Sequence, residues 1–244
     1  MSNHQDKSAS KGASKAKKGD GWKSNLLTIG GALLLALVIR VTLFEAFAID
    51  GPSMEPTLLD GDRVVVAKYP FGLFLPFTDE AVVNWGGPDP GDVIIVHSPA
   101  DNEDIVKRVI GVGGDEILIR GGKISRNGEV LETIDLGPCS KEEQKNLDPT
   151  CRVYQETLDG DPHRISHSKH DFPLDRLPLR VPEGHVYVLG DHRDSSNDSR
   201  NPLIGAIPNS RIKGKSLFMY MSWKNTPGSV WERIRWSRVG SSVD

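Results

Sequence analysis

A serine in a tight turn is a candidate nucleophile. Ser53 lies in "AIDGPSMEPTLLDGD", residues 48–62, where Pro52 fixes the approach of the chain, Pro56 prevents an ordinary helix or strand and Gly51 admits a close backbone. Serine reacts only with a base in hydrogen-bond reach and with donors for the oxyanion. No histidine is near Ser53 in sequence, so the base comes from a distant segment or is another residue type. An ordinary turn serine is the alternative.

A lysine in a strand-like segment is a candidate base. In "DIVKRVIGVGGDE", residues 104–116, alternation groups Lys107 with Ile105 and Val109, and Arg108 with Val106 and Ile110. Arginine stays protonated in proteins, whereas a desolvated lysine can lose its charge. To act near neutral pH, the pKa of Lys107 must fall from about 10.4 by roughly three units. A strand lysine that snorkels to solvent is the alternative, and alternation cannot say which face is buried.

A third polar segment, "GDHRDSSNDSRN" at 190–201, follows a strand-like stretch. Its dense Asp, Ser and Arg residues suit either a hydrated loop held by Asp–Arg pairs or a polar scaffold that fixes the base and the serine turn.

Composition and the N-terminal region indicate a tethered, exported domain. The net charge of −3 over 244 residues gives no case for a nucleic-acid partner. Residues 1–23 hold six lysines among small polar residues and are expected to be a disordered basic tail. The apolar run 26–44 would form a helix of roughly 28 Å, which predicts a transmembrane anchor over 24–45. The lysines then keep the tail in the cytoplasm and place 46–244 outside. A buried core helix is one alternative; a signal peptide cleaved within Ala46-Phe47-Ala48 is another.

After the anchor, short β-branched or aromatic segments bracketed by turn residues predict a mainly β, antiparallel, barrel-like domain. The expected strands are 62–69, 92–98, 104–112, 115–120, 185–191 and 216–223. The Asn-Gly pair within 126–129 suits a tight hairpin.

Two insertions interrupt this pattern, one at 69–90 and one at 137–182. The first is expected to fold onto the sheet as a loop, with contact to a membrane surface as the alternative. The second is expected to be a solvated loop, although its three histidines make a metal cluster conceivable; they are His163, His167 and His170.

Two cysteines, Cys139 and Cys151, lie within the second insertion. An exported location permits a disulfide that stabilises the domain by about 3 kcal/mol. Two free thiols are the alternative, and a metal site would need more ligands close by.

The three polar segments together resemble one known family. "SMEPTL", "KRVIGVGGDE" and "GDHRDSSNDSR", in this order after one anchor, resemble the type I signal peptidase family of Ser/Lys serine proteases. The resemblance runs from about residue 26 to "GKSLFMYMSW" and leaves out the tail and the polar insertion. It implies that Ser53 is the nucleophile and Lys107 the general base. It also implies that Ser196 orients the lysine amine and that Asp198 and Arg200 form a supporting ion pair.

The resemblance also describes substrate binding. Phe47, Ile49 and Val106 correspond to walls of the shallow pockets for small residues at −1 and −3, and Asp50 stands where many members have proline. The backbone N–H of Ser53 corresponds to the oxyanion donor. Some members add a serine hydroxyl where this chain has Gly51, and His192 replaces the usual asparagine.

The expected function is that of a membrane-bound serine endopeptidase that removes signal peptides from exported preproteins after small-x-small sites. The resemblance implies the cytoplasmic or inner membrane as location, the lipid bilayer and nearby secretion machinery as partners, and no cofactor or metal. Two alternatives remain: a Ser/His hydrolase using His192 or His97, and a tethered β module that binds export partners without catalysis.

Overall fold

The computed structural model describes residues 21–74, 81–140, 148–168, 176–224 and 226–243. The chain divides into two compact units, Met1–Ile39 and Arg40–Asp244. Helix α1 spans Gly21–Leu43, and most of the expected basic tail lies outside the described residues. No helix in the described part of the chain combines the length and the apolar character that crossing a bilayer requires.

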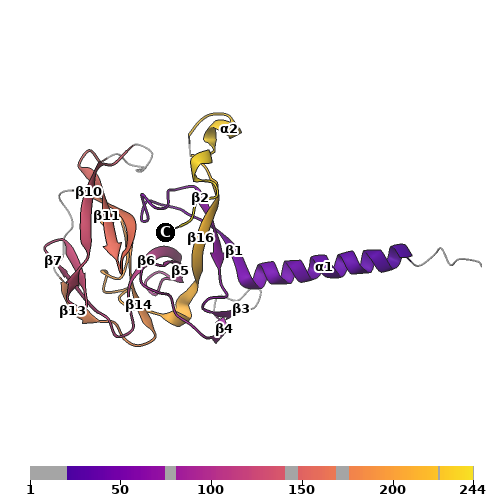
Figure 1. The fold of residues 1–244 in the computed structure, drawn as a ribbon, viewed down its shortest axis with the longest axis horizontal. Coiled ribbons are helices and arrows are strands. Elements are labelled where there is room, and N and C mark those ends of the chain that lie inside the picture. The colour runs from indigo at the N-terminus through magenta and orange to yellow at the C-terminus, as the bar shows by residue number, and fades with distance from the viewer. Residues whose placement is uncertain (1–20, 75–80, 141–147, 169–175, 225, 244) are drawn as a thin grey trace, which may run out of the picture. The chain divides into compact units, whose positions relative to one another are not determined.

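The second unit is built on a seven-stranded antiparallel sheet, which agrees with the expected mainly β class (Figure 1). Its strands, in spatial order, are β1 (Phe44–Ala48), β2 (Asp62–Ala67), β16 (Ile212–Ser222), β5 (Val93–His97), β6 (Asp104–Val112), β14 (His185–Leu189) and β15 (Ile207–Pro208). The order has β1 and β15 at its two ends, so among the described residues this sheet is open and not a closed barrel.

Three smaller sheets complete the unit. One contains β13 (Arg176–Arg180), β7 (Glu116–Arg120), β8 (Lys123–Arg126) and β9 (Glu129–Val130); another contains β10 (Glu132–Pro138), β11 (Cys151–Leu158) and β12 (Asp161–Ser168); the third pairs β3 (Gly72–Phe74) with β4 (Ala81–Asn84). The short helices are η1 (Asn209–Arg211), α2 (Val230–Arg233) and η2 (Trp236–Arg238). Asn127 and Gly128 both have positive φ, as the predicted tight hairpin between β8 and β9 requires.

The polar insertion differs from the solvated loop that its composition suggested. Its described parts contain β11 and β12, which pair with each other, and β13, which pairs with β7. Cys151 and Val153 are buried on one face of β11–β12, and Leu158 and Ile165 are buried on the other. Cys139 and Cys151 form a disulfide. His163 is buried beside a carboxylate, His170 lies outside the described residues, and no group of His, Cys, Asp and Glu in the described ranges could hold a metal.

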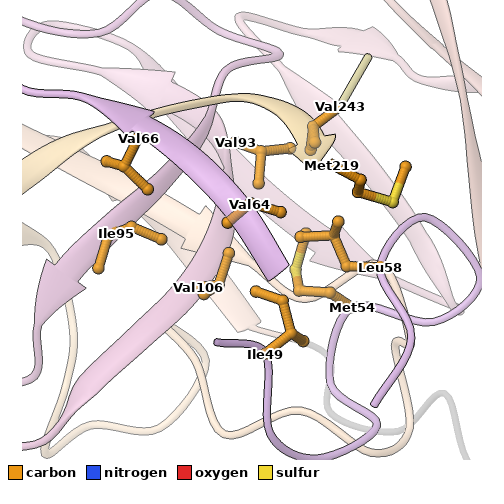
Figure 2. Packing of buried hydrophobic residues seen from close by; sticks show 10 residues of the cluster. All are labelled: Ile49, Met54, Leu58, Val64, Val66, Val93, Ile95, Val106, Met219 and Val243. Atoms are coloured by element: carbon orange, nitrogen blue, oxygen red, sulfur yellow. The ribbon is translucent and has the colours of Figure 1, made fainter. Parts of the chain in front are cut away.

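The core packs on both faces of the large sheet. Val64 and Val66 of β2, with Val93 and Ile95 of β5, face one cluster, shown in Figure 2. Ile94 and Val96 face a second cluster with strands β14 and β15. Strand β6 contributes Val106 to the first cluster and Val109 to the second, so this strand is buried on both sides. Any charged side chain in the middle of β6 is therefore desolvated.

Candidate active site

The candidate nucleophile lies in the turn that joins β1 to β2. Backbone hydrogen bonds from Glu55 N to Pro52 O (3.0 Å) and from Leu58 N to Met54 O (2.9 Å) close the chain on itself around Ser53. Met54 and Leu58 insert into the first core cluster (Figure 2), so the turn is anchored immediately after the serine. The two backbone hydrogen bonds and the two buried apolar side chains thus fix the position of the serine turn.

The amine of Lys107 meets this hydroxyl. Lys107 Nζ lies 2.9 Å from Ser53 Oγ and 2.8 Å from Val106 O, and its side chain is 3% exposed. Burial lowers the pKa of Lys107 to about 8, while the carboxylates of Asp198 and Asp191 act in the opposite direction. A neutral amine at this distance can accept the serine proton, which is the first requirement of Ser/Lys chemistry.

The expected ion pair between Asp198 and Arg200 is present. Arg200 Nε donates to Asp198 Oδ1 at 2.8 Å and Arg200 Nη2 donates to Asp198 Oδ2 at 2.7 Å. Gly190 N also donates to this carboxylate, and Arg200 Nη2 donates to Arg193 O. Asp191, Arg193 and Asp198 of this segment are buried, and its His192 N–H donates to Ser53 O, so the scaffold interpretation is favoured over a hydrated loop.

Ser196 lies next to the serine turn but makes no hydrogen bond to Lys107. Its Oγ is buried and has no hydrogen-bond partner among the described residues. A Cβ added at Gly190 would come within 2.2 Å of Ser196 Oγ and 2.4 Å of Ser53 O, so all three residues pack closely. The donor capacity of Lys107 goes instead to Ser53 and Val106. The orienting role of Ser196 stays a prediction.

The three expected pocket residues gather in one apolar cluster. Ile49 and Val106 are 6% and 7% exposed, and Phe47 packs against the same group. Figure 2 shows Ile49 and Val106 beside Met54, the residue after the serine. Ile49 also lines a cavity of about 590 Å³, but neither Ser53 nor Lys107 lines that cavity.

Gly51 has a backbone reason to be glycine. Its φ is +89°, a region that L side chains rarely adopt, and its N–H donates to Asp60 Oδ1 at 3.1 Å. A serine at this position would be strained.

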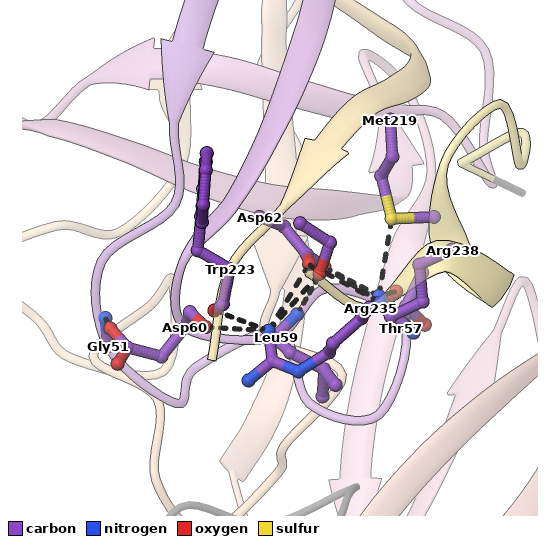
Figure 3. A network of polar contacts seen from close by, with 10 residues as sticks. Gly51, Thr57, Leu59, Asp60, Asp62, Met219, Trp223, Arg235 and Arg238 are labelled. Carbon is purple, nitrogen blue, oxygen red and sulfur yellow. Dashed lines mark hydrogen bonds and ion pairs between the residues drawn. The ribbon is translucent and has the colours of Figure 1, made fainter. Parts of the chain in front are cut away.

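Two C-terminal arginines, Arg235 and Arg238, which the sequence analysis missed, fix the far end of the serine turn (Figure 3). Asp62 is fully buried and accepts hydrogen bonds from Leu59 N (2.8 Å), Ser222 Oγ (2.5 Å) and Arg238 Nη2 (2.6 Å). Arg238 Nη2 also donates to Thr57 O at 2.7 Å. Both arginines lie beyond "GKSLFMYMSW", outside the segment that carries the resemblance, so no motif pointed to them.

Two more buried ion pairs escaped the sequence analysis. Arg108 donates to both oxygens of Asp191 at 2.9 and 2.8 Å, and Arg193 donates to both oxygens of Glu156. Arg193 and His163 outweigh the opposing effect of burial and lower the pKa of Glu156 to about 2. The charge of Arg108 inside the largely apolar segment 104–112 was the available signal, but the sequence does not reveal its partner.

Neither candidate histidine base is placed to activate the serine. His97 Nδ1 lies 3.0 Å from Asp104 Oδ1, within the β5–β6 hairpin. His192 does reach the serine turn, but its Nδ1 lies 3.3 Å from Pro52 O. Among the described residues, the side chain hydrogen-bonded to Ser53 Oγ is Lys107.

Comparisons with known proteins identify the family of this chain. The sequence model of the family described as "Signal peptidase, peptidase S26" matches residues 22–223. A signal peptidase I of Pseudomonas fluorescens is 35% identical over 202 residues, covering 78% of this chain and 69% of that protein. A signal peptidase I of Pseudomonas aeruginosa is 35% identical over 220 residues, covering 85% and 75%.

A crystal structure of a signal peptidase I from Enterococcus faecalis is 23% identical, with a TM-score of 0.31, and covers 52% of this chain and 95% of that one. The family model and the two sequence relatives carry the assignment. The chain therefore belongs to the signal peptidase family, peptidase S26, and is an enzyme of that serine endopeptidase class.

Proposed function

We propose that this chain is a membrane-bound endopeptidase that removes N-terminal signal peptides from exported preproteins, with Ser53 as nucleophile and Lys107 as general base. The observation that carries the proposal is the 2.9 Å contact between a buried lysine amine and the serine hydroxyl. In this proposal Asp198 and Arg200 hold the loop that supports the site, and Ser196 orients the amine once the precursor is bound.

The chemistry follows the general course of covalent serine catalysis. The neutral Lys107 amine takes the proton of Ser53 as Oγ bonds to the scissile carbonyl carbon. The resulting oxyanion accepts a hydrogen bond from Ser53 N–H. The Lys107 ammonium then gives its proton to the departing amine of the mature protein, which leaves the signal peptide as an ester on Ser53. Water, deprotonated by Lys107, hydrolyses that ester and regenerates the hydroxyl.

Specificity for small residues follows from the apolar cluster beside the serine. Phe47, Ile49 and Val106 would form the walls that accept side chains at −1 and −3. These residues are close packed, so a large side chain at either position would displace core atoms.

Tethering to a membrane is part of the same proposal. Leu27, Leu33 and Leu34 of the 23-residue helix α1 are 80%, 66% and 63% exposed, and such apolar surface favours a lipid environment. The basic residues 1–23 would stay in the cytoplasm, and 46–244 would act on the outer side of the cell membrane. Placement near the secretion machinery would bring Ser53 to precursors as they emerge.

Cleavage of a model precursor tests the proposed function. Detergent-solubilised full chain is expected to cut a precursor with an Ala-x-Ala site after its last alanine, as mass spectrometry of both products would show. The matched control precursor carries tryptophan at −1, and the matched enzyme control is Ser53→Ala; both reactions should give no product. The proposal would be refuted if the Ala-x-Ala precursor stayed uncut with the wild-type enzyme, or if Ser53→Ala cut it.

The pH dependence of kcat/KM should report Lys107. Below about pH 8 the amine of the free enzyme is protonated and cannot accept a proton. We therefore expect kcat/KM to fall about tenfold per pH unit on the acidic side and to level off above that pH. Asp198 raises the pKa of Lys107 and Arg200 lowers it, so Asp198→Asn should move the midpoint to lower pH.

Asp159→Asn is a matched control for this measurement, because Asp159 forms an exposed ion pair with Arg126 away from the serine turn. Its profile should follow that of the wild type. A midpoint that stays in place or rises in Asp198→Asn would contradict the assigned electrostatics.

A further inference from the structure

One residue, His192, hydrogen-bonds the carbonyl groups on both sides of the serine. The backbone N–H of His192 donates to Ser53 O at 3.1 Å. Its ring Nδ1 lies 3.3 Å from Pro52 O. A carbonyl oxygen only accepts hydrogen bonds, so Nδ1 carries the hydrogen in this contact. The two peptide groups that flank Ser53 are thus tied to a single residue of the 190–200 loop.

The Pro52 carbonyl matters because it shares a planar peptide group with the N–H of Ser53. Holding the oxygen of that group therefore fixes the direction of the N–H on its opposite side. Pro52 O also accepts Glu55 N at 3.0 Å, so His192 supplies its second donor. Hydrogen bonds at an amide oxygen polarise the group and strengthen its N–H as a donor.

The surroundings make this contact effective. His192 and Glu55 are 6% and 2% exposed, and Glu55 Oε2 lies 3.7 Å from His192 Nδ1. Fixed dipoles act more strongly in such a dry region than in water. Burial lowers the pKa of His192, against the opposing effect of Asp194, so the ring stays neutral where the Lys107 amine loses its proton.

We propose that His192 is a positioning residue that orients and polarises the Ser53 N–H through the Pro52 carbonyl, and so strengthens the oxyanion donor. The inference rests on the proposed function, in which Ser53 N–H stabilises the oxyanion. His192 takes no proton from Ser53 and touches no substrate in this role. Asparagine, the usual residue at this place in the resemblance, also has a side-chain N–H that can donate to Pro52 O.

The test compares three substitutions in the full-length protein. His192→Leu keeps most of the packed volume without a donor, His192→Ala removes both, and His192→Asn restores a donor. The matched control is His185→Ala, because His185 Nδ1 likewise contacts a backbone carbonyl, Glu183 O at 3.0 Å, at a position outside the serine turn. Each variant is assayed for kcat, KM and melting temperature with the Ala-x-Ala precursor.

We expect kcat to fall about tenfold in His192→Leu and His192→Ala with KM little changed, less than the 10²–10³ of deleting an oxyanion donor itself. His192→Asn should remain within about threefold of the wild type, because the hydrogen bond is restored. A peptide aldehyde, to which Ser53 Oγ adds to give a tetrahedral hemiacetal carbon whose oxygen occupies the oxyanion position, should bind the Leu variant more weakly by a similar factor. His185→Ala should behave as the wild type does.

Three results would overturn this role. A kcat equal to that of the wild type in folded His192→Leu would reject the positioning role of His192. A kcat of His192→Asn no higher than that of His192→Leu would also reject it. A Leu variant with raised KM and unchanged kcat would make His192 a binding residue instead. Cleavage by the wild type separates these outcomes from failure of the proposed function, because an inactive wild type would refute both at once.

Discussion

Replacing Lys107 by methionine should lower kcat for precursor cleavage by about 10⁴-fold or more, the scale seen when a catalytic dyad or triad loses its base. Methionine keeps the apolar stem but has no amine, so Ser53 Oγ loses the acceptor that now lies 2.9 Å away. Lys107→Arg should be equally inactive, because a guanidinium keeps its proton and its charge. Steady-state cleavage measures both variants, and Lys123→Met, at an exposed lysine of β8, is the matched control.

Lys107→Met should also stabilise the fold. Burial lowers the pKa of Lys107 from 10.5 in the unfolded chain to about 8 in the native state, so the unfolded state binds the proton more tightly. The native state is then penalised by on the order of 3 kcal/mol below pH 8, and the penalty fades as pH rises toward 10.5. Lys107→Met should therefore unfold at higher urea concentration than the wild type at pH 7, with a smaller difference at pH 10.

These two results together distinguish a catalytic lysine from a structural one. If Lys107 were structural, its replacement would lower both the stability and the activity of the protein. If Lys107 is a desolvated base, its replacement lowers the activity and raises the stability. Appreciable cleavage by folded Lys107→Met would reject the assignment and return attention to the Ser/His alternative.

The strand positions were predictable because their physics is local. The expected strands at 62–69, 92–98 and 104–112 match β2, β5 and β6 within two residues at each end. Their β-branched residues fit a pleated, buried surface, and their ends carry turn residues. The disulfide between Cys139 and Cys151 was left open beside free thiols, and the structure contains it.

The burial of β6 and the origin of the ion pairs were not predictable, because both depend on distant segments. Alternation separates Lys107 from Arg108 and suggests that one of them faces solvent, but both are buried. The partner of Arg108 lies 83 positions away at Asp191. The polar composition of the insertion likewise concealed the β11–β12 hairpin, whose Ser166 Oγ donates to Glu55 O next to the serine.

Breaking the Arg108–Asp191 pair should produce a large loss of stability, because both side chains are buried. Arg108→Leu leaves the fully buried carboxylate of Asp191 without its two guanidinium donors. Burial alone would raise the pKa of Asp191, and it is the Arg108 charge that lowers it. Removing one partner of a buried pair typically costs about 3–5 kcal/mol, because an uncompensated charge remains. Urea unfolding of Arg108→Leu and Asp191→Leu measures the loss.

The double variant Arg108→Leu/Asp191→Leu should recover most of this loss, because apolar residues of similar volume replace a buried pair with little penalty. Arg152→Leu is the matched control, since Arg152 pairs with Asp135 in the same way on the surface and should change stability far less. Asp191 also raises the pKa of Lys107, so the single variant Asp191→Leu should shift the pH midpoint of kcat/KM downward. If Arg108→Leu were no less stable than Arg152→Leu, or if the double variant were as unstable as either single one, the pair would not be the buried support of Lys107 that its geometry indicates.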